Sequence, residues 1–437
     1  MLKTVKFGGS SVAGAEQFRK VKAIVNADES RRVVVVSAAG KRSSDDHKLT
    51  DLLYLCHAHL QYGVSCDEIF DSIKERLISI RDELGLSCPV EEKLQLLRSR
   101  LNRDFSVDEL VSRGEYFTSL LMAEFLGFSF VDAADCVFFN FEGQLDMAKT
   151  ESAIKSALEK NGKIVIPGFY GSLPSGKIKV MSRGGSDISG ALAAAATDSD
   201  IYENWTDVSG ILMADPKIVD NPRSISKITF GELRELAFMG ASVLHEESIL
   251  PVREKGIPLN IRNTNRPDDP GTMIVGNVED ESEDERFLTG IAGRRGFNVL
   301  TLHRHDMNLS HTLSKALSVF DRYHVNVEHI TLGLDSFALV ASAAALGENL
   351  YEIISDMKKE CHAEDIEVQD NIALVAAVGR KMSSRLGTSG EIFNALGSHG
   401  VNIRTIAQGS DELSIIIGVD NNNFETAVRV LYDGFAG

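Results

Sequence analysis

Two short stretches combine a basic side chain with paired glycines: Lys6 with Gly8, Gly9 and Ser10, and Arg183 with Gly184 and Gly185. In both, strand-like residues precede the glycines and a helical pattern follows. Such a junction presents bare backbone N–H groups at the positive end of a helix, which favours an anion, usually phosphate. A tight turn beside a surface lysine explains the first stretch equally well. The second stretch, with an arginine suited to a carboxylate or phosphate, favours a binding site.

Acidic and hydroxyl side chains near these junctions suit a small polar substrate. Glu115 follows Gly114 inside a predicted helix, where a glycine costs about 1 kcal/mol relative to alanine. We therefore expect something to approach that backbone closely. Glu115 then faces inward and needs a cation, unless it forms a surface pair with Arg113. Thr50 is either a helix N-cap or a hydroxyl directed at substrate.

Further carboxylates follow the second glycine junction. Ser186 or Asp187 can cap the helix that begins there. Thr206 and Asp207 end a predicted strand, and a loop with Asp215 and Lys217 comes next. A carboxylate at a strand end beside a phosphate site suits magnesium or ribose; a turn-capping Asp is the alternative.

The elements that position these residues alternate between strand and helix. Short apolar runs over 32–38, 163–166, 202–208 and 257–264 read as strands, the first with four consecutive valines and the fourth as the last strand of the segment. Strands buried on both faces are typical of a parallel sheet, whose ligands bind at the carboxyl ends of the strands. Residues 67–103 read as a helical insertion, and Ser106 to Glu109 as a capping box. Residues 171–178 match the P-loop spacing but end in Ile178, so we expect a hairpin there.

The C-terminal third repeats itself after a boundary marked by the Pro267–Gly271 turn and an acidic run over 279–285. Residues 325–330 align with 401–406, 76 positions later, and each copy reads strand, helix, strand, strand, helix. This order predicts two small α+β modules. We predict a catalytic domain over 1–278, a linker over 279–290, and modules over 291–365 and 366–437.

Composition narrows the class of partner. The net charge of −17 argues against nucleic acid and anionic membranes. We expect no secretory signal, no membrane span and no structural metal, because neither apolar runs nor His and Cys spacings support them. Five cysteines without C-x-x-C spacing fit free thiols in the cytoplasm.

Together these motifs resemble the aspartate kinase family, in the family's order and over essentially the whole chain. They are residues 6–11, 112–115, 182–187, 206–208, 215–216 and 240–245, with the twin C-terminal units similar to ACT modules. The resemblance implies an α/β fold: an amino-acid-kinase-like sheet sandwiched by helices, plus two ferredoxin-like ACT modules. It also implies ATP and Mg²⁺ as cofactors.

By this resemblance, several positions acquire roles. The implied catalytic residues are Lys6 and Asp187. Aspartate contacts are Thr50, Glu115, Phe169, Arg183, Gly184 and Ser186; nucleotide contacts are Lys6, Gly8, Gly9, Ser10, Thr206, Asp207, Asp215 and Lys217. Candidate effector contacts are Asn326, Glu328, Leu332, Asn402 and Ile403.

The implied reaction is ATP-dependent phosphorylation of L-aspartate to 4-phospho-L-aspartate, the first step toward lysine, threonine and methionine. The acceptor carboxylate, with a pKa of about 3.9, is ionised at pH 7, so the site must supply charge neutralisation and in-line positioning rather than a general base. Feedback by lysine or, second, threonine is expected at the ACT modules, with a homodimer or higher oligomer. No dinucleotide fingerprint follows, so we expect no fused homoserine dehydrogenase.

Some positions depart from the family pattern. Leu212 replaces an aromatic residue, Ser242 a lysine, and residues 328–332 differ from the usual effector motif. Two alternatives therefore stay open. One is a kinase of the same superfamily for another acid, and the other is a non-catalytic amino-acid sensor.

Overall fold

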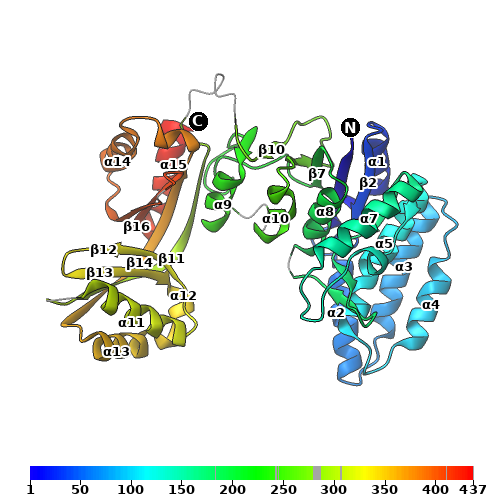
Figure 1. The fold of residues 1–437 in the computed structure, drawn as a ribbon, viewed down its shortest axis with the longest axis horizontal. Helices are drawn as coiled ribbons and strands as arrows, with labels where there is room; N and C mark the ends of the chain where they lie inside the picture. Colours follow the sequence, from blue (N-terminus) through cyan, green and yellow to red (C-terminus); the bar gives the residue numbers. More distant parts are fainter. Residues whose placement is uncertain are drawn as a thin grey trace. The chain divides into compact units, whose positions relative to one another are not determined.

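The computed structural model describes residues 1–182, 184–241, 244, 246–278, 287–305, 308–409 and 411–436. The chain forms two compact units (Figure 1). The first comprises Met1–Ile211, Ser226–Phe230 and Val243–Glu279; the second comprises Leu212–Ile225, Gly231–Ser242 and Asp280–Gly437. Among the described helices, none is long and apolar enough to cross a membrane. The segments 212–225 and 231–242, inside the catalytic range expected from sequence, cluster with the C-terminal residues.

The first unit is built on an eight-stranded sheet in the order β3-β4-β2-β1-β7-β9-β10-β8. Its strands are β1 (Lys3–Phe7), β2 (Arg31–Val36), β3 (Ser129–Phe130), β4 (Ile164–Pro167), β7 (Ile201–Thr206), β8 (Lys227–Thr229), β9 (Leu259–Asn263) and β10 (Thr272–Val275). Neighbouring strands are parallel except for the β9–β10 pair. The predicted parallel sheet is therefore confirmed, with β1 at its centre.

Helices cover both faces of this sheet. They are α1 (Ala15–Asn26), α2 (Leu49–Gln61), α3 (Asp67–Glu83), α4 (Val90–Arg100), α5 (Val107–Leu126), α6 (Ala133–Cys136), α7 (Met147–Asn161), α8 (Gly185–Ala196) and α10 (Glu246–Glu254), with the short helix η1 (Gly9–Val12). Val5 and Phe7 of β1 pack with α1 and α5 in one core. Alternate residues of β2, Val33 and Val35, pack with α6, α7 and α8 in a second core. Successive side chains of a strand point to opposite faces of its sheet, so the two cores lie on opposite faces.

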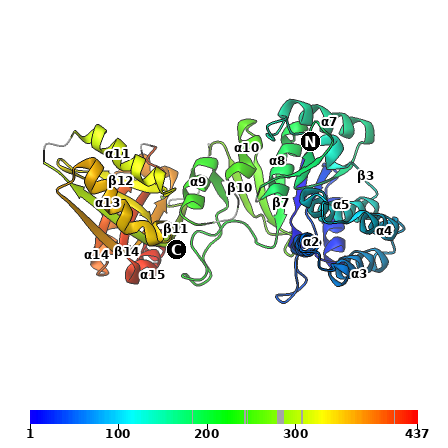
Figure 2. The same ribbon diagram turned by 90° about the horizontal axis from the view of Figure 1, so that it is seen from below.

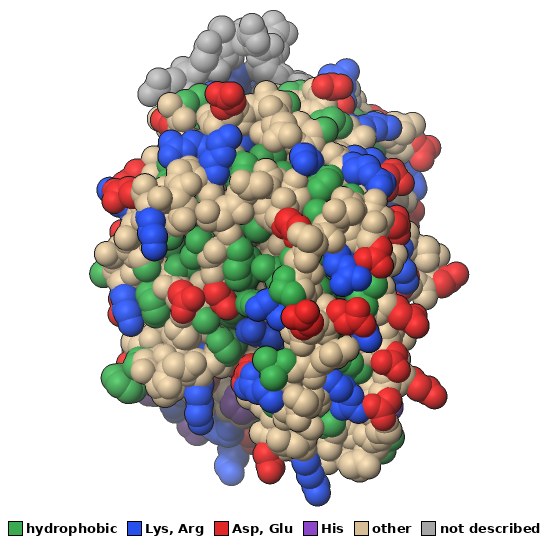
Figure 3. Space-filling model, turned by 90° about the vertical axis from the view of Figure 1, so that its right-hand side faces the viewer, with side chains coloured by type: hydrophobic (Ala, Val, Ile, Leu, Met, Phe, Trp, Pro, Cys, Tyr) green, Lys and Arg blue, Asp and Glu red, His purple; other side chains and the backbone are tan. Residues whose placement is uncertain are grey.

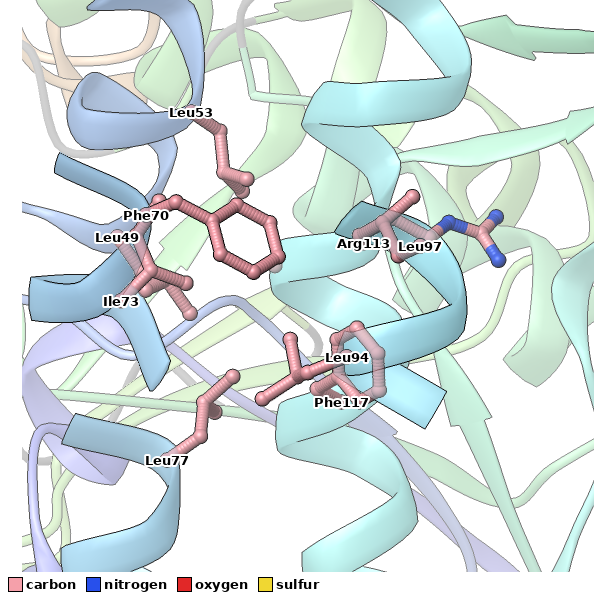
Figure 4. Close-up of a pocket in the computed structure, with 10 residues that line it drawn as sticks. Leu49, Leu53, Phe70, Ile73, Leu77, Leu94, Leu97, Arg113 and Phe117 are labelled. Atoms are coloured by element: carbon pink, nitrogen blue, oxygen red, sulfur yellow. The ribbon is translucent and has the colours of Figure 1, made fainter. Parts of the chain in front are cut away.

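The predicted helical insertion forms a bundle in which α2, α3, α4 and α5 lie side by side (Figures 1 and 2). Figure 4 shows apolar side chains from all four helices converging, while the Arg113 guanidinium points away from them. The hollow between them leaves no room for a water molecule. Ser106 caps α5 by accepting the Glu109 N–H, as predicted from the capping box.

Three local expectations from sequence are corrected. Thr50 is not an N-cap, because α2 begins at Leu49 with Lys48 before it. Neither Ser186 nor Asp187 caps α8; Gly184, with a positive φ of 77°, occupies that position without a side-chain bond. The strand around 257–264 is not the last in its sheet, since β10 follows the Pro267–Gly271 turn and pairs with β9.

The expected hairpin in place of a P-loop is present. β5 (Tyr170–Ser172) pairs antiparallel with β6 (Ile178–Val180). No helix follows the glycines at 171–176 as a phosphate-binding P-loop would require.

The second unit holds a six-stranded antiparallel sheet in the order β12-β13-β11-β14-β16-β15. The strands are β11 (Gly290–His303), β12 (Val327–Leu332), β13 (Ser336–Ser342), β14 (Asp365–Val378), β15 (Ile403–Gln408) and β16 (Ser414–Asp420). The helices are α9 (Phe230–Phe238, its first residue in the first unit), α11 (Leu309–Arg322), α12 (Ala343–Leu346), α13 (Leu350–Cys361), α14 (Thr388–Ser398), α15 (Phe424–Phe435), η2 (Gly347–Asn349), η3 (Arg380–Ser383) and η4 (Asn421–Asn423).

The repeat seen in the sequence is visible in this unit. β12 and β15 span equivalent positions 76 residues apart, and each copy follows the predicted element order. The central strands β11 and β14 pair with each other from Gly290–Val378 to His303–Asp365. The second half of β11 also pairs with β13, and the second half of β14 with β16. Each long strand therefore runs through both modules, so the strand pairing does not divide at a single residue.

Candidate active site

Lys6 lies inside the central strand β1 and points toward the face covered by α8. Only 6% of the residue is exposed, so it is not a snorkelling surface lysine. Its ammonium group lies 2.7 Å from Asp187 Oδ1 and donates to Asn204 Oδ1 at 3.4 Å. A buried ammonium is stable only with such partners.

Asn204 completes a closed set of three polar side chains. It stands beside Lys6 in the β1–β7 register, and its Nδ2 donates to Asp187 Oδ1 at 2.8 Å. Asp187 comes from the first turn of α8. Sequence reasoning missed Asn204, although the two polar residues Glu203 and Asn204 between Tyr202 and Trp205 in a buried strand were a usable signal.

The glycines after β1 allow two loops to touch. Gly40 N–H donates to the Gly9 carbonyl at 2.8 Å, and a Cβ on Gly40 would lie 2.5 Å from the Gly9 backbone. A Cβ on Gly9 would lie 2.9 Å from the Ala38 carbonyl oxygen. Gly8 lies next to Lys6, whose Nζ is 3.5 Å from the position of a Gly8 Cβ. The two loops at the carboxyl ends of β1 and β2 thus form one backbone surface, with Ser10 in η1.

Glu115 faces inward from α5 toward the second of these loops. It is 3% exposed, and one carboxylate oxygen, Oε2, is buried with no hydrogen-bond partner. Burial raises the pKa of Glu115 to about 8, and a hydrogen bond with the Ala38 backbone opposes that rise. The inward interpretation is therefore correct and the surface pair with Arg113 is wrong. In the described part of the chain, the cation that this carboxylate needs is not supplied.

Gly114 explains how Glu115 comes so close to the loop. A Cβ at Gly114 would lie 2.9 Å from the Ala38 side chain and 3.2 Å from Leu53 Cδ1. The Thr50 methyl group lies 3.8 Å from the same point. The predicted close approach to this glycine is confirmed, and it brings Thr50 and Glu115 to one region.

The turn after β4 meets the start of α8. Phe169 has a positive φ of 77°, a conformation that a bulky residue adopts only when its surroundings hold it. Its N–H donates to Ser189 Oγ at 2.9 Å. A Cβ on Gly185 would meet the Phe169 ring at 2.6 Å, and one on Gly168 would meet Ser186 at 2.9 Å. Phe169, Gly184 and Ser186 are thus gathered together, whereas Arg183 lies outside the described residues, as does Ser242.

The remaining nucleotide candidates fall in two places. Thr206 ends β7, and its hydroxyl donates to Asp207 Oδ1 at 3.2 Å. Asp215 and Lys217 belong to the second unit, where the Lys217 N–H donates to Asp215 Oδ1 at 2.9 Å. Leu212, also in the second unit, is partly exposed.

The side chains of the site fit Mg²⁺ only as a nucleotide-bound ion. Among the described residues, no group of three or more His, Cys, Asp or Glu side chains could hold a metal. Asp187 accepts from Lys6 and Asn204 through Oδ1, and its side chain is 23% exposed. One carboxylate with phosphate oxygens and water is a common Mg²⁺ environment, so Asp187 is the residue that would hold it.

The side of the molecule shown in Figure 3 carries charged side chains of both signs. On the side shown in Figure 3, Lys and Arg alternate with Asp and Glu around a patch of hydrophobic side chains. One open groove of the first unit, of about 630 Å³, lies between β6 and α10, and its lining includes Ser182 and Ile188. The substrate-binding candidates lie at the strand ends.

The effector candidates lie on or just before the edge strands of the second unit. Asn326 and Asn402 are exposed and directly precede β12 and β15. The two strands approach within 8 Å between Cα atoms. Glu328 is bound by Arg294 at 2.6 Å, and Leu332 is 59% exposed. The edge strands of the two modules therefore come together, and Ile403 is the first residue of β15.

Comparison with known proteins shows the family of the chain. Residues 1–263 match the amino acid kinase family, and residues 375–435 match the ACT domain. Aspartokinase 3 of Bacillus subtilis is 32% identical over 450 residues, covering 99% of this chain and 98% of the relative.

Two solved aspartate kinases are similar along the full chain. The Clostridium acetobutylicum enzyme has a TM-score of 0.91 and 43% identity, with 99% of each chain covered. Escherichia coli aspartokinase III is 27% identical in two complexes, one with aspartate and ADP (TM-score 0.75, 99% of each chain) and one with lysine and aspartate (TM-score 0.74, 100% of each chain). The chain belongs to the amino acid kinase family and, within it, to the aspartokinases, which phosphorylate aspartate with ATP.

Proposed function

We propose that the Lys6–Asp187–Asn204 cluster and the glycine loops after β1 and β2 carry the aspartate kinase reaction. Two anions, the phosphate chain and the aspartate β-carboxylate, must approach each other in line. Lys6 supplies a fixed positive charge between its two partners. The backbone of Gly9 and Ser10 supplies N–H groups near the same point, whereas the Gly8 N–H donates to the Trp205 carbonyl oxygen at 2.9 Å. Mg²⁺ on the nucleotide supplies further charge neutralisation when bound.

The observation that carries aspartate binding is the orphaned carboxylate of Glu115. A buried carboxylate oxygen without a partner costs stability, and an incoming ammonium group satisfies it. We infer that Glu115 binds the α-ammonium of aspartate, with Thr50, Phe169, Gly184 and Ser186 around the rest of the molecule. Arg183 takes the α-carboxylate by the family resemblance.

The reaction itself needs no general base. The β-carboxylate is the nucleophile and already carries its charge at pH 7. Asp187 and Asn204 hold the orientation of the Lys6 ammonium group. Thr206, Asp207, Asp215 and Lys217 are proposed as nucleotide contacts.

Exchange of Lys6 for methionine tests this site. The volume is similar and the charge is lost, so we expect kcat to fall by at least about 1,000-fold, as for loss of a preorganised transition-state charge. Aspartate KM should change much less than kcat. The assay traps the acyl phosphate as hydroxamate. Lys3 lies on the same strand as Lys6 and pairs with Asp28, so a Lys3→Met variant is the matched control. Near-normal turnover by Lys6→Met would refute the assignment.

We propose that lysine is the feedback effector and binds where β12 and β15 meet. One of the E. coli complexes contains lysine, and carboxylate and amide groups of Glu328, Asn326 and Asn402 suit an amino acid.

Exposed Ile330, Leu332 and Ile406 on these edge strands suit self-association, so we propose a homodimer. Five free thiols fit a reducing cytoplasm.

Activity measured with lysine and threonine, separately and together, tests the effector. We expect inhibition by lysine alone, lost on Glu328→Gln with aspartate KM unchanged. Inhibition by threonine alone would show that threonine, and not lysine, is the effector. Inhibition by neither amino acid would refute the proposed feedback regulation. Sedimentation tests the dimer.

A further inference from the structure

One buried arginine in the helical bundle contacts both glycine loops of the site. Arg76 lies in the middle of α3 and is 4% exposed. No role for it follows from the sequence motifs, since the segment 67–103 shows only a helical pattern. Its guanidinium nevertheless points out of the bundle core toward the strand ends.

The guanidinium is surrounded by backbone carbonyl oxygens. Arg76 Nη1 donates to the His47 carbonyl at 2.7 Å. Nη2 donates to the Gly40 carbonyl and to the Ala13 carbonyl at 3.4 Å. The Asp46 carboxylate lies 3.4 Å from Nη2.

These carbonyls belong to two different loops. Ala13 closes the loop after β1, which carries Gly8, Gly9 and Ser10. Gly40 and His47 belong to the loop after β2, which includes the Ala38 backbone beside Glu115 and leads into α2, the helix that carries Thr50. The planar guanidinium of Arg76 thus connects the proposed phosphate surface to the proposed aspartate surface.

The direction of these carbonyls matters for binding anions. In a trans peptide the C=O and the following N–H point in opposite directions. Because Arg76 holds the Ala13 and Gly40 carbonyls on the α3 side, the N–H groups of Gly14 and Lys41 point away from α3. The partially negative oxygens are thereby kept off the face where phosphate is proposed to bind.

A lysine cannot replace this arrangement. Its ammonium is one point with three donors, whereas the guanidinium presents donors in a fixed plane. Through Nη1 and Nη2, Arg76 donates to three carbonyls in two loops. This spread of donors favours arginine over lysine.

We propose that Arg76 is a positioning residue for the aspartate kinase reaction, which fixes the loops after β1 and β2 relative to each other. This inference rests on the proposed roles of those loops. Arg76 does not touch the reacting atoms; it acts through the backbone of Ala13, Gly40 and His47. Displacement of reacting groups by about 1 Å can cost about 100-fold in rate.

The test compares Arg76→Lys and Arg76→Met with Leu77→Ala, a neighbouring buried residue of α3 whose loss weakens the bundle without touching the loops. We expect both Arg76 variants to lose about 10- to 100-fold in kcat/KM, with KM raised for ATP and for aspartate. Leu77→Ala should lower the melting temperature and leave both KM values unchanged. All rates are taken per folded molecule, below each melting temperature.

Three outcomes overturn the proposal. The first is Arg76→Lys or Arg76→Met with wild-type KM for both substrates. The second is Leu77→Ala with the same KM increases. The third is that neither Arg76 variant folds while Leu77→Ala does. The Lys6→Met variant distinguishes the positioning role of Arg76 from the proposed active site around Lys6. If Lys6→Met is inactive and the Arg76 variants are normal, only the positioning role of Arg76 is refuted.

Discussion

Replacement of Glu115 by glutamine should stabilise the ligand-free enzyme while weakening aspartate binding. Glutamine has nearly the same shape and mimics the neutral acid. Burial raises the pKa of Glu115 from the ordinary 4.5 to about 8. At pH 7 the Glu115 carboxyl is therefore ionised in the unfolded chain, whereas it is protonated in the folded protein.

The size of the effect follows from proton linkage. Each pH unit between the two pKa values costs about 1.4 kcal/mol. From 4.5 to 7 this amounts to roughly 3 kcal/mol of stability lost by the wild type and not by the variant. Since the folded pKa of this carboxyl is raised, its penalty is absent below about 4.5 and grows as pH rises toward 8. Glu115→Gln should gain little at pH 4.5 and most near pH 8.

Thermal unfolding across pH 5 to 8.5 measures the difference. With about 2–4 °C per kcal/mol for a unit of this size, we expect the variant to melt roughly 6–12 °C higher at pH 7. Aspartate should raise the melting temperature of the wild type much more than that of the variant. Loss of one charge-assisted hydrogen bond should raise aspartate KM about 10- to 100-fold, with ATP KM unchanged.

Two results would refute this reasoning. A stability difference that does not change with pH would show that Glu115 keeps its ordinary pKa. An unchanged aspartate KM would show that its free oxygen is not the ammonium site. Glu109→Gln, on the exposed side of the same helix with Arg100 as partner, is the matched control and should show neither effect.

Three further outcomes are expected. Gly114→Ala should gain about 1 kcal/mol of helix propensity but lose more through the 2.9 Å contact with Ala38; a melting temperature at or above wild type contradicts this. Arg31→Met should cost about 3–5 kcal/mol in urea unfolding, because it leaves Glu203, 2.8 Å away, buried without its arginine. The Arg31→Met/Glu203→Gln double variant should recover part of the loss, and no recovery would count against the pair. The thiols of the native protein should react slowly with Ellman's reagent at pH 8, since burial raises the pKa of Cys56 and Cys88 to about 12. Rapid labelling would show that these thiols are accessible to solvent. All five thiols should react once the protein is unfolded.

The local signals in the sequence were reliable where one physical cause dominates. Four valines could only form a buried strand, and β2 is that strand. Ile178 in the last P-loop position excluded a magnesium hydroxyl, and the segment is a hairpin. An interior glycine predicted a close approach, and Gly114 has one.

Other features depended on contacts between distant residues. Asn204 joins Lys6 only because β7 lies beside β1, which sequence spacing does not show. Arg76 looked like any charged residue of an amphipathic helix, and its carbonyl partners lie 29 to 63 positions away. The turn at Pro267–Gly271 looked like a domain end, yet β10 after it returns to the sheet.

The sequence by itself determined the chemistry: which basic, acidic and glycine residues are available, and that each group follows a strand. These properties depend on neighbours within a few positions, where propensity and period act. The tertiary structure decided which of those groups meet. It buried Glu115 without a cation, placed Asn204 against Lys6, and put the Arg76 guanidinium between two loops, because burial and long-range pairing set the pKa and the orientation of each side chain.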